Sequence, residues 1–312
     1  MTKYVCGRIA QAIVVLLLIT CITFLLMNLV PGGPFLSEKS PSPEVLAALE
    51  AKYGLDKPLL VQLKNYLTDI LHGDFGVSFK MQKNRPVLDI IMEMFPVSAR
   101  IGVIAFAGAV LFGVPIGCLA AYHRGKGLDS FLRVVTTLGV SVPGFVIASV
   151  LMHIFGVKLG WVSIIGLPDW KSYILPCFAL AFYPMCYIGR LARSSMLDVI
   201  NQEYIRTARA KGVSSTYIIF KHALRNAFIP VLTYLGPLLA GILTGSFVVE
   251  TVYTIPGLGR YFIQSILNRD YPIIMGTTIF FATLILVMTL VVDILYRAVD
   301  PRVDLSKGGN KA

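Results

Sequence analysis

The stretch Ile9–Val30 reads IAQAIVVLLLITCITFLLMNLV and contains no charged side chain. A helix needs about 20 largely apolar residues to cross the hydrocarbon core of a bilayer, and this stretch supplies them. It ends at Pro31–Pro34, Pro-Gly-Gly-Pro, which favours a helix stop. The apolar part exceeds the roughly 7–15 residues of a secretory signal, and no small-residue cleavage site follows. We therefore predict an uncleaved membrane-spanning helix.

Five further apolar stretches extend this prediction to the whole chain. Of its 312 residues, 56% are hydrophobic and only 14% are charged, whereas soluble domains carry about 25% charged residues. The fourth of the six stretches holds Pro176 and Pro184, which membrane helices tolerate. We predict an all-α membrane protein with six transmembrane helices, Ile9–Val30, Ile101–Tyr122, Val134–Phe155, Tyr173–Gly189, Phe228–Val249 and Ile274–Tyr296.

The basic residues sort by side of the membrane. With the N-terminus inside, the inner segments hold 16 basic and 5 acidic residues, and the outer segments hold 12 basic and 11 acidic residues. Cytoplasmic loops carry the excess of Lys and Arg, so both termini are expected in the cytoplasm. This sorting explains the net charge of +11 without nucleic acid. The five cysteines lie in or beside apolar runs and predict neither a disulfide framework nor a metal site.

The first outer segment, residues 31–100, is too long for a simple connection and has a helical pattern of its own. Ser42-Pro43-Glu44 predicts a helix start, and Gly54 ends that helix. A second helix is expected from near Pro58 to Gly73. This helical loop is either a platform that meets a partner or an interfacial hairpin that covers the helix bundle.

The longest inner segment, residues 190–227, has a helix–glycine–helix pattern. A first helix is expected over Ser194–Lys211, Gly212 breaks it, and Ser214 and Ser215 can cap a second helix that leads into the fifth span. An ordinary positive-inside loop would explain most of its Lys and Arg residues. It would not explain the regular helix–glycine–helix pattern between two spans, which we call the Gly212 corner.

Within this segment, the runs EYIRTARAKG (residues 203–212) and HALRN (residues 222–226) resemble the EAA loop of ABC importer permeases. The general pattern, E-A-A-x3-G-x9-I-x-L-P, is matched in register by Ala208, Gly212 and Leu224. The run RTARAKG is similar to the variant found in the oligopeptide, dipeptide and nickel permease family, although Arg206, Thr207, His222 and Arg225 depart from the general pattern. In that family the loop forms a short coupling helix that sits in a groove of the ATPase subunit. The resemblance therefore assigns ATPase coupling to Glu203, Arg206, Thr207, Ala208, Arg209, Ala210, Lys211, Gly212, His222, Leu224 and Arg225.

The likeness to this family covers nearly the whole chain. Similar motifs are PGGPF (31–35), YGLDKP (53–58), HGDFGVSF (72–79), SVPGF (141–145), VETVYTIPGLG (249–259), NRDYP (268–272) and VDPR (299–302). The long outer loop, with PGGPF and with EAKY at residues 50–53, is most similar to the oligopeptide permeases of the first ("B") type.

This resemblance implies a type I ABC importer permease fold with three parts: the N-terminal helix (1–30), the external helical loop (31–100) and a permease core (101–312) that contains the coupling loop (190–227). It implies half of a translocation path for oligopeptides in a bacterial cytoplasmic (inner) membrane. The expected partners are a homologous second permease, two ABC ATPases that bind ATP and Mg, an extracytoplasmic peptide-binding protein and membrane lipid, with no nucleic acid. A dipeptide or nickel permease of the same family is the alternative.

The sequence holds no motif for chemistry of its own. Gly125-Lys126 is followed by Gly127, so there is no phosphate-binding GxxxxGK[ST] loop, and neither HExxH nor GxSxG occurs. We therefore expect no catalytic residue, no metal and no cofactor in this chain, which is predicted not to be an enzyme.

An ion-coupled secondary transporter is the alternative from a different class. Such proteins place ionisable residues near the midplane of the membrane, and Asp293 is the only formal charge within the predicted spans. Asp293 lies four residues before Arg297 on one helix face, which favours a structural ion pair over a proton relay. A membrane scaffold, the third class, would leave the Gly212 corner without a purpose.

Two pairs of glycines have the small-xxx-small spacing that lets membrane helices approach closely. These pairs are Gly113 with Gly117 and Gly241 with Gly245. We favour packing within this chain, and the alternative is a contact with a second permease.

The predicted orientation can be tested with an impermeant thiol reagent on intact cells. The variants Ser40→Cys and Lys80→Cys should be labelled because both positions lie in the outer segment, and Ser214→Cys should not. The native cysteines should remain unlabelled because they lie within or beside the spans. Labelling of Ser214→Cys in sealed cells would overturn the orientation.

Overall fold

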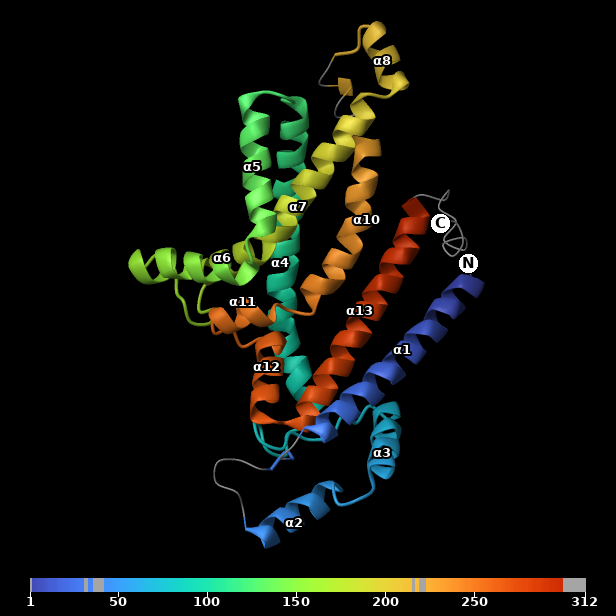
Figure 1. Ribbon diagram of the computed structural model, residues 1–312, viewed down its shortest axis with the longest axis vertical. Helices are drawn as coiled ribbons and strands as arrows, with labels where there is room; N and C mark the ends of the chain where they lie inside the picture. The colour runs from blue at the N-terminus through green and yellow to red at the C-terminus, as the bar shows by residue number, and fades with distance from the viewer. Residues whose placement is uncertain (1, 31–32, 36–41, 215–216, 219–222, 300–312) are drawn as a thin grey trace. The chain divides into compact units, whose positions relative to one another are not determined.

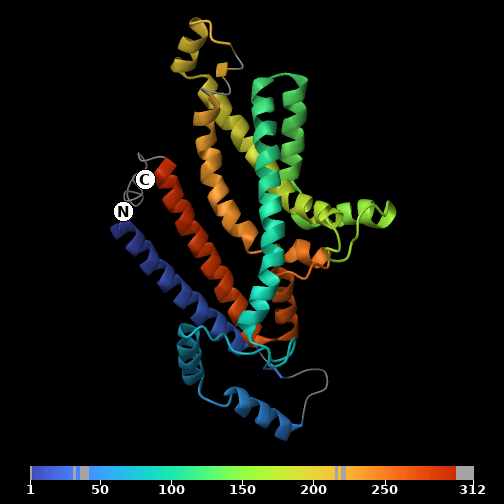
Figure 2. The same cartoon turned by 180° about the vertical axis from the view of Figure 1, so that it is seen from behind.

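The computed structural model describes residues 2–30, 33–35, 42–214, 217–218 and 223–299. Within them, five helices are long and apolar enough to cross a membrane, and a sixth is added if one bent pair of helices counts as a single span. The chain divides into two compact units, residues 1–97 with 256–287 and residues 98–255 with 288–312. Figures 1 and 2 show the course of the chain from two opposite sides.

The first unit is built around one apolar cluster. Its elements are α1 (Thr2–Leu29), α2 (Pro43–Tyr53), α3 (Leu59–Leu71), the start of α4 (Val87–Tyr122), α12 (Leu258–Asn268) and most of α13 (Tyr271–Val299). Phe24 and Met27 of α1 pack with Ile274, Met275 and Ile279 of α13. Residues of α3 and Phe262 of α12 pack against this cluster, so the outer-loop helix α3 is attached to the two long helices.

The two predicted helices of the outer segment are confirmed. Ser42 caps α2, because its Oγ accepts a hydrogen bond from the Val45 amide at 3.4 Å. Gly54 follows the last residue of α2 with φ +67°, the left-handed conformation that ends many helices. The helix α3 begins directly after Pro58, and Gly73, two residues after its end, has φ +80°.

A buried carboxylate fixes the end of the outer loop. Asp270, between α12 and α13, accepts a hydrogen bond from Ser78 Oγ at 2.6 Å and three from the backbone amides of residues 79–81 at 2.9–3.0 Å. Asp270 has no solvent exposure. Hydrogen bonds to a charged acceptor are stronger than those between neutral groups, so this contact orders the loop before α4.

The second unit is organised by α7 (Ile174–Ile200). It packs against α5 (Gly127–Ser141), α6 (Gly144–Leu151) and α10 (Leu224–Leu243), as Figure 1 shows. The remaining elements are the rest of α4, the π-helix η1 (Met152–Lys158), the 3₁₀ turn η2 (Lys171–Tyr173), α8 (Glu203–Ala210), α11 (Phe247–Val252) and the end of α13.

The prediction of one helix over Val134–Phe155 is wrong. The chain bends by 102° between α5 and the segment Gly144–Lys158. Pro143 has no amide hydrogen to donate, and it disfavours helical backbone at the preceding residue. Val142 is accordingly extended, with φ −83° and ψ 126°. The third predicted span is therefore not one continuous helix.

Three other boundaries also differ from the predictions. The helix α4 begins at Val87 instead of Ile101, because charged residues interrupt the apolar run without interrupting the helix. The helix α7 continues past the predicted end at Gly189 to Ile200. The prediction of a single helix over Ser194–Lys211 is wrong, because Gln202 is extended (φ −71°, ψ 151°) and separates α7 from α8.

The fifth predicted span, Phe228–Val249, breaks near its end. The helix α10 stops at Leu243, Gly245 has φ +85°, and α11 follows. Glu250 of α11 is 1% exposed and lies within the candidate span Leu224–Val252. The candidate span therefore extends past the predicted end at Val249 and includes the carboxyl group of Glu250.

Candidate functional site

The predicted coupling loop contains a short helix, α8, that is anchored by one side chain. Ile205 has no solvent exposure and packs in an apolar cluster. The other buried members of the cluster come from α4, α7, the segment before α10 and α10 itself, and are Ala121, Met196, Ile218, Ala223 and Ala227. Burying an isoleucine stabilises this position by about 1.5–3 kcal/mol, so α8 is fixed to the ends of three longer helices.

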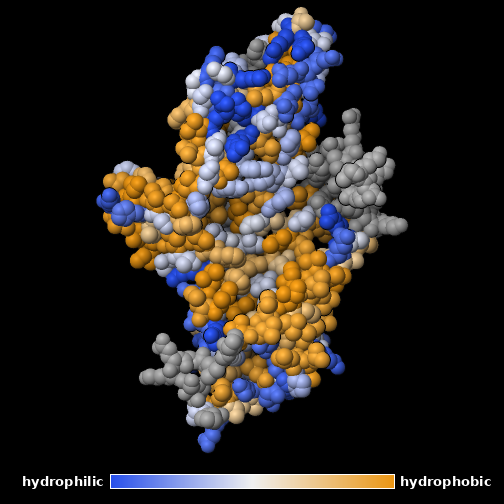
Figure 3. All heavy atoms as spheres, in the orientation of Figure 1, coloured by the Kyte–Doolittle hydropathy of each residue, from blue (hydrophilic) through white to orange (hydrophobic). Residues whose placement is uncertain are grey.

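The opposite side of α8 is polar and exposed. Arg206, Arg209 and Lys211 are exposed, as are Glu203, Thr207 and Ala210. None of the three cations takes part in an ion pair with another residue that the structure describes. In the space-filling view, the end of the molecule that carries α8 is hydrophilic, whereas the surface over α6 and η1 is hydrophobic (Figure 3).

Gly212 ends α8 in the left-handed conformation, with φ +78°. Its amide donates to the Arg209 carbonyl at 2.9 Å, and the Val213 amide donates to the Ala208 carbonyl at 3.2 Å. The second bond is the six-to-one contact of a Schellman ending, and Val213 and Ala208 both pack against the Ile205 cluster. No other group lies within 4 Å of a Cβ added at Gly212, so only backbone conformation restricts this position.

A second contact joins α8 to the start of α10. Asn226 Nδ2 donates a hydrogen bond to the Tyr204 hydroxyl at 2.8 Å. Leu224 packs against the Ile205 cluster, and Arg225 is exposed. The structure thus brings the two halves of the EAA-like sequence together, while His222 lies outside the described residues.

An ion pair that the sequence analysis did not predict joins α7 to α5. Arg193 of α7 donates to both carboxylate oxygens of Asp129, at 2.7 and 2.9 Å. Asp129 is 1% exposed and also accepts from the Gly125 amide at 3.0 Å. The pair joins the start of α5 to α7, ten residues before α8 begins. In the sequence both residues were only two of many loop charges, and nothing in the spacing pairs them.

The two predicted glycine pairs differ in the structure. A Cβ added at Gly113 would lie 2.7 Å from the Met185 carbonyl oxygen, and one added at Gly117 would lie 2.4 Å from the Gly189 carbonyl oxygen. The helix α4 therefore approaches α7 closely at both glycines. Gly241 has no neighbour within 4 Å of an added Cβ. Gly245 lies beyond the end of α10, so it forms a turn and is not a helix-packing position.

The remaining predicted contact cannot be placed. The side chains of Asp293 and Arg297 lie outside the part of the chain that the structure describes. Among the described residues, no group of three or more His, Cys, Asp and Glu side chains could hold a metal ion. The helix α8 presents the exposed cations Arg206 and Arg209, with Lys211 directly after its end, and is anchored by the buried Ile205, an arrangement suited to binding another surface.

Comparisons with known proteins identify the family to which the sequence is similar. Residues 113–305 match the family described as "binding-protein-dependent transport system inner membrane component", and residues 1–102 match its N-terminal part. The dipeptide transport system permease protein DppB of Bacillus subtilis is 45% identical over 99% of this chain and 100% of its own length. The oligopeptide transport system permease protein OppB of Haemophilus influenzae is 44% identical over 97% of this chain and 99% of its own length.

A solved structure shares the fold. A chain of the MetNI methionine ABC transporter, in an inward-facing conformation, is similar with a TM-score of 0.58. The match covers 68% of this chain and 97% of that chain at 17% identity. The type I ABC importer permease fold is thereby confirmed for the larger part of the chain.

The Asp129–Arg193 pair makes a testable contribution to stability. Arg193→Gln removes the partner that donates two hydrogen bonds to the buried Asp129 carboxylate. Leaving a buried charge without its partner lowers the free energy of unfolding. Because Arg193 is itself 21% exposed, water screens the pair in part, and we expect a loss of about 2 kcal/mol. The measurement is thermal unfolding of the purified protein in detergent.

The matched control for this experiment is Arg133→Gln, since Arg133 lies 3.7 Å from the same carboxylate and is 54% exposed. It should change stability by less than about 0.5 kcal/mol. The double variant Asp129→Asn with Arg193→Gln should regain part of the loss. Equal effects of Arg193→Gln and Arg133→Gln would contradict a structural role for the pair.

Proposed function

Because this chain belongs to the family of binding-protein-dependent transport system inner membrane components, and is a transmembrane permease subunit of an ABC importer, we propose that it forms half of a translocation path for oligopeptides. A second, homologous permease forms the other half, and the complex lies in the bacterial cytoplasmic membrane. The full-length relatives support peptides as the solute, since one is named for dipeptide transport and another for oligopeptide transport.

The exposed face of α8 is proposed as the contact with an ATPase subunit. The observation that carries this proposal is a cationic helix held on the buried Ile205 and closed by Gly212. Such a helix can transmit a displacement, because its buried Ile205 shares an apolar cluster with the ends of α4, α7 and α10. A flexible loop of the same charge would absorb the displacement instead.

The proposed assembly contains two ATPases on the cytoplasmic side, each binding ATP and Mg. An extracytoplasmic peptide-binding protein delivers the solute on the other side, where α2 and α3 offer a docking platform. The excess of Lys and Arg in the predicted inner segments supports a cytoplasmic location for both termini. Closure of the ATPases would push α8 and switch the helices from inward- to outward-facing.

The comparisons bear differently on the alternative functions considered for this chain. Family membership identifies an ABC importer, so an ion-coupled secondary transporter does not describe this chain. Within the family, a nickel or dipeptide permease remains the alternative to an oligopeptide permease. The Asp293–Arg297 ion pair and the contact of Gly241 with a second permease stay predictions.

The coupling proposal can be tested at Gly212. Gly212→Val forces a β-branched residue into a left-handed conformation that costs about 1 kcal/mol or more. The ending of α8 should be lost, and peptide uptake and peptide-stimulated ATP hydrolysis should fall together. Membrane insertion should remain intact, because Gly212 lies in the loop between the spans.

Gly212→Asn is the matched control, since asparagine tolerates the left-handed conformation far better. Both substitutions add a side chain to open space, so only backbone strain separates them. The asparagine variant should keep most of the uptake. Normal peptide-stimulated ATP hydrolysis in Gly212→Val would show that α8 does not couple the ATPase to transport.

A further inference from the structure

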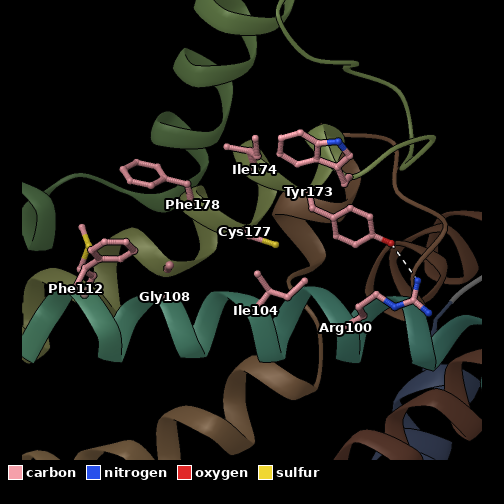
Figure 4. Close-up of a pocket in the computed structure, with 11 residues that line it drawn as sticks. Arg100, Ile104, Gly108, Phe112, Tyr173, Ile174, Cys177 and Phe178 are labelled. Carbon is pink, nitrogen blue, oxygen red and sulfur yellow. Dashed lines mark hydrogen bonds between the residues drawn. The ribbon is translucent and has the colours of Figure 1, made fainter.

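A cavity of about 660 Å³ lies between α4 and α7 in the second unit, away from α8. Figure 4 shows Arg100, Ile104, Gly108 and Phe112 in succession along α4. These residues are spaced by four, which puts them on one face of the helix. Facing them are Tyr173 of η2 and residues of α7 that include Ile174, Cys177 and Phe178 (Figure 4).

Most of the cavity is apolar, and its lining reaches the surface of the chain. Ile104, Phe112, Ile174 and Phe178 line it and remain exposed at the surface of the chain. Both walls belong to helices that are long and apolar enough to span a membrane, so an opening on this face can meet the hydrocarbon of the bilayer. Gly108 contributes to this space, because a Cβ added there would meet only Ala181 Cβ, at 4.0 Å.

One end of the cavity is polar and basic. Arg100 Nη1 donates to the Tyr173 hydroxyl at 3.2 Å, and among the described residues the guanidinium forms no ion pair. The exposed Trp170 lines the same end, and Lys171 lies over its ring at 5.9 Å. The nearby carboxylate of Asp169 accepts two hydrogen bonds from Ser172. Guanidinium, tyrosine and tryptophan together are typical of the membrane interface.

The length of the cavity fits one leaflet. From Arg100 to Phe112 the helix rises about 18 Å at 1.5 Å per residue, and half of a hydrocarbon core is about 15 Å. A peptide would fit poorly, because its backbone groups would be buried against side chains that offer few hydrogen-bonding partners. We propose that this cavity is a binding site for a glycerophospholipid, with an acyl chain between α4 and α7 and the phosphate on Arg100.

Photo-cross-linking can test this site in the full complex reconstituted into vesicles. The probes are a phosphatidylglycerol with a diazirine on one acyl chain and a diacylglycerol with the same chain and no phosphate. Phosphatidylglycerol should label peptides from 100–112 or 173–185. Diacylglycerol should label them about tenfold less, the value of one charge-assisted hydrogen bond. Arg100→Gln should lower phosphatidylglycerol labelling to the diacylglycerol level.

A variant that fills the cavity with a larger side chain provides a second test. Gly108→Leu places a side chain in the cavity and should abolish labelling by both probes. Gly7→Leu is the matched control, because an added Cβ there meets no group within 4 Å and Gly7 does not line the cavity. Equal labelling by both probes would overturn the phosphate contact. Labelling of the isolated subunit but not of the full complex would show that another subunit covers the cavity, and would overturn the lipid site.

Discussion

The absence of water in the hydrocarbon core constrains every segment of this chain that crosses a membrane. A backbone amide or carbonyl there must be hydrogen-bonded within the protein, so the crossing segments are helices. Where a crossing helix cannot continue, the local sequence accounts for it: Pro143 has no amide to donate, and Gly245 takes a left-handed turn. Outside the hydrocarbon the constraint is relaxed, and there the chain forms short helices with caps, such as α2 and α8.

Close packing of α7 links these constraints to function. Gly113 and Gly117 let α4 approach the backbone of α7, and Arg193 ties α7 to Asp129 at the start of α5. At its end α7 contributes Met196 to the cluster that holds Ile205. In the proposed mechanism a displacement of α8 therefore reaches α4, α7 and α10 through the shared Ile205 cluster, and α5 through the contacts of α7.

Local signals in the sequence predicted the local structure well. Ser42 and Gly54 mark the ends of α2, and Gly212 marks the end of α8, because caps and left-handed turns depend on a few neighbouring residues. Hydropathy located the spans but not their ends. The helix α4 begins at Val87 because Val87, Ile90 and Ile91 are buried, a fact that depends on tertiary contacts. The Asp129–Arg193 pair was also out of reach, since its members are 64 residues apart.

The central claim is that the exposed face of α8 contacts an ATPase subunit, and photo-cross-linking tests it most directly. A photoreactive amino acid at Ala210, which is exposed at the end of α8, would be illuminated in membranes that contain the assembled complex. The same amino acid at Lys64, exposed on α3, serves as the control. The account predicts an adduct with the ATPase from Ala210 and none from Lys64. An adduct with the ATPase from Lys64, or none from Ala210 in a complex that hydrolyses ATP, would contradict it.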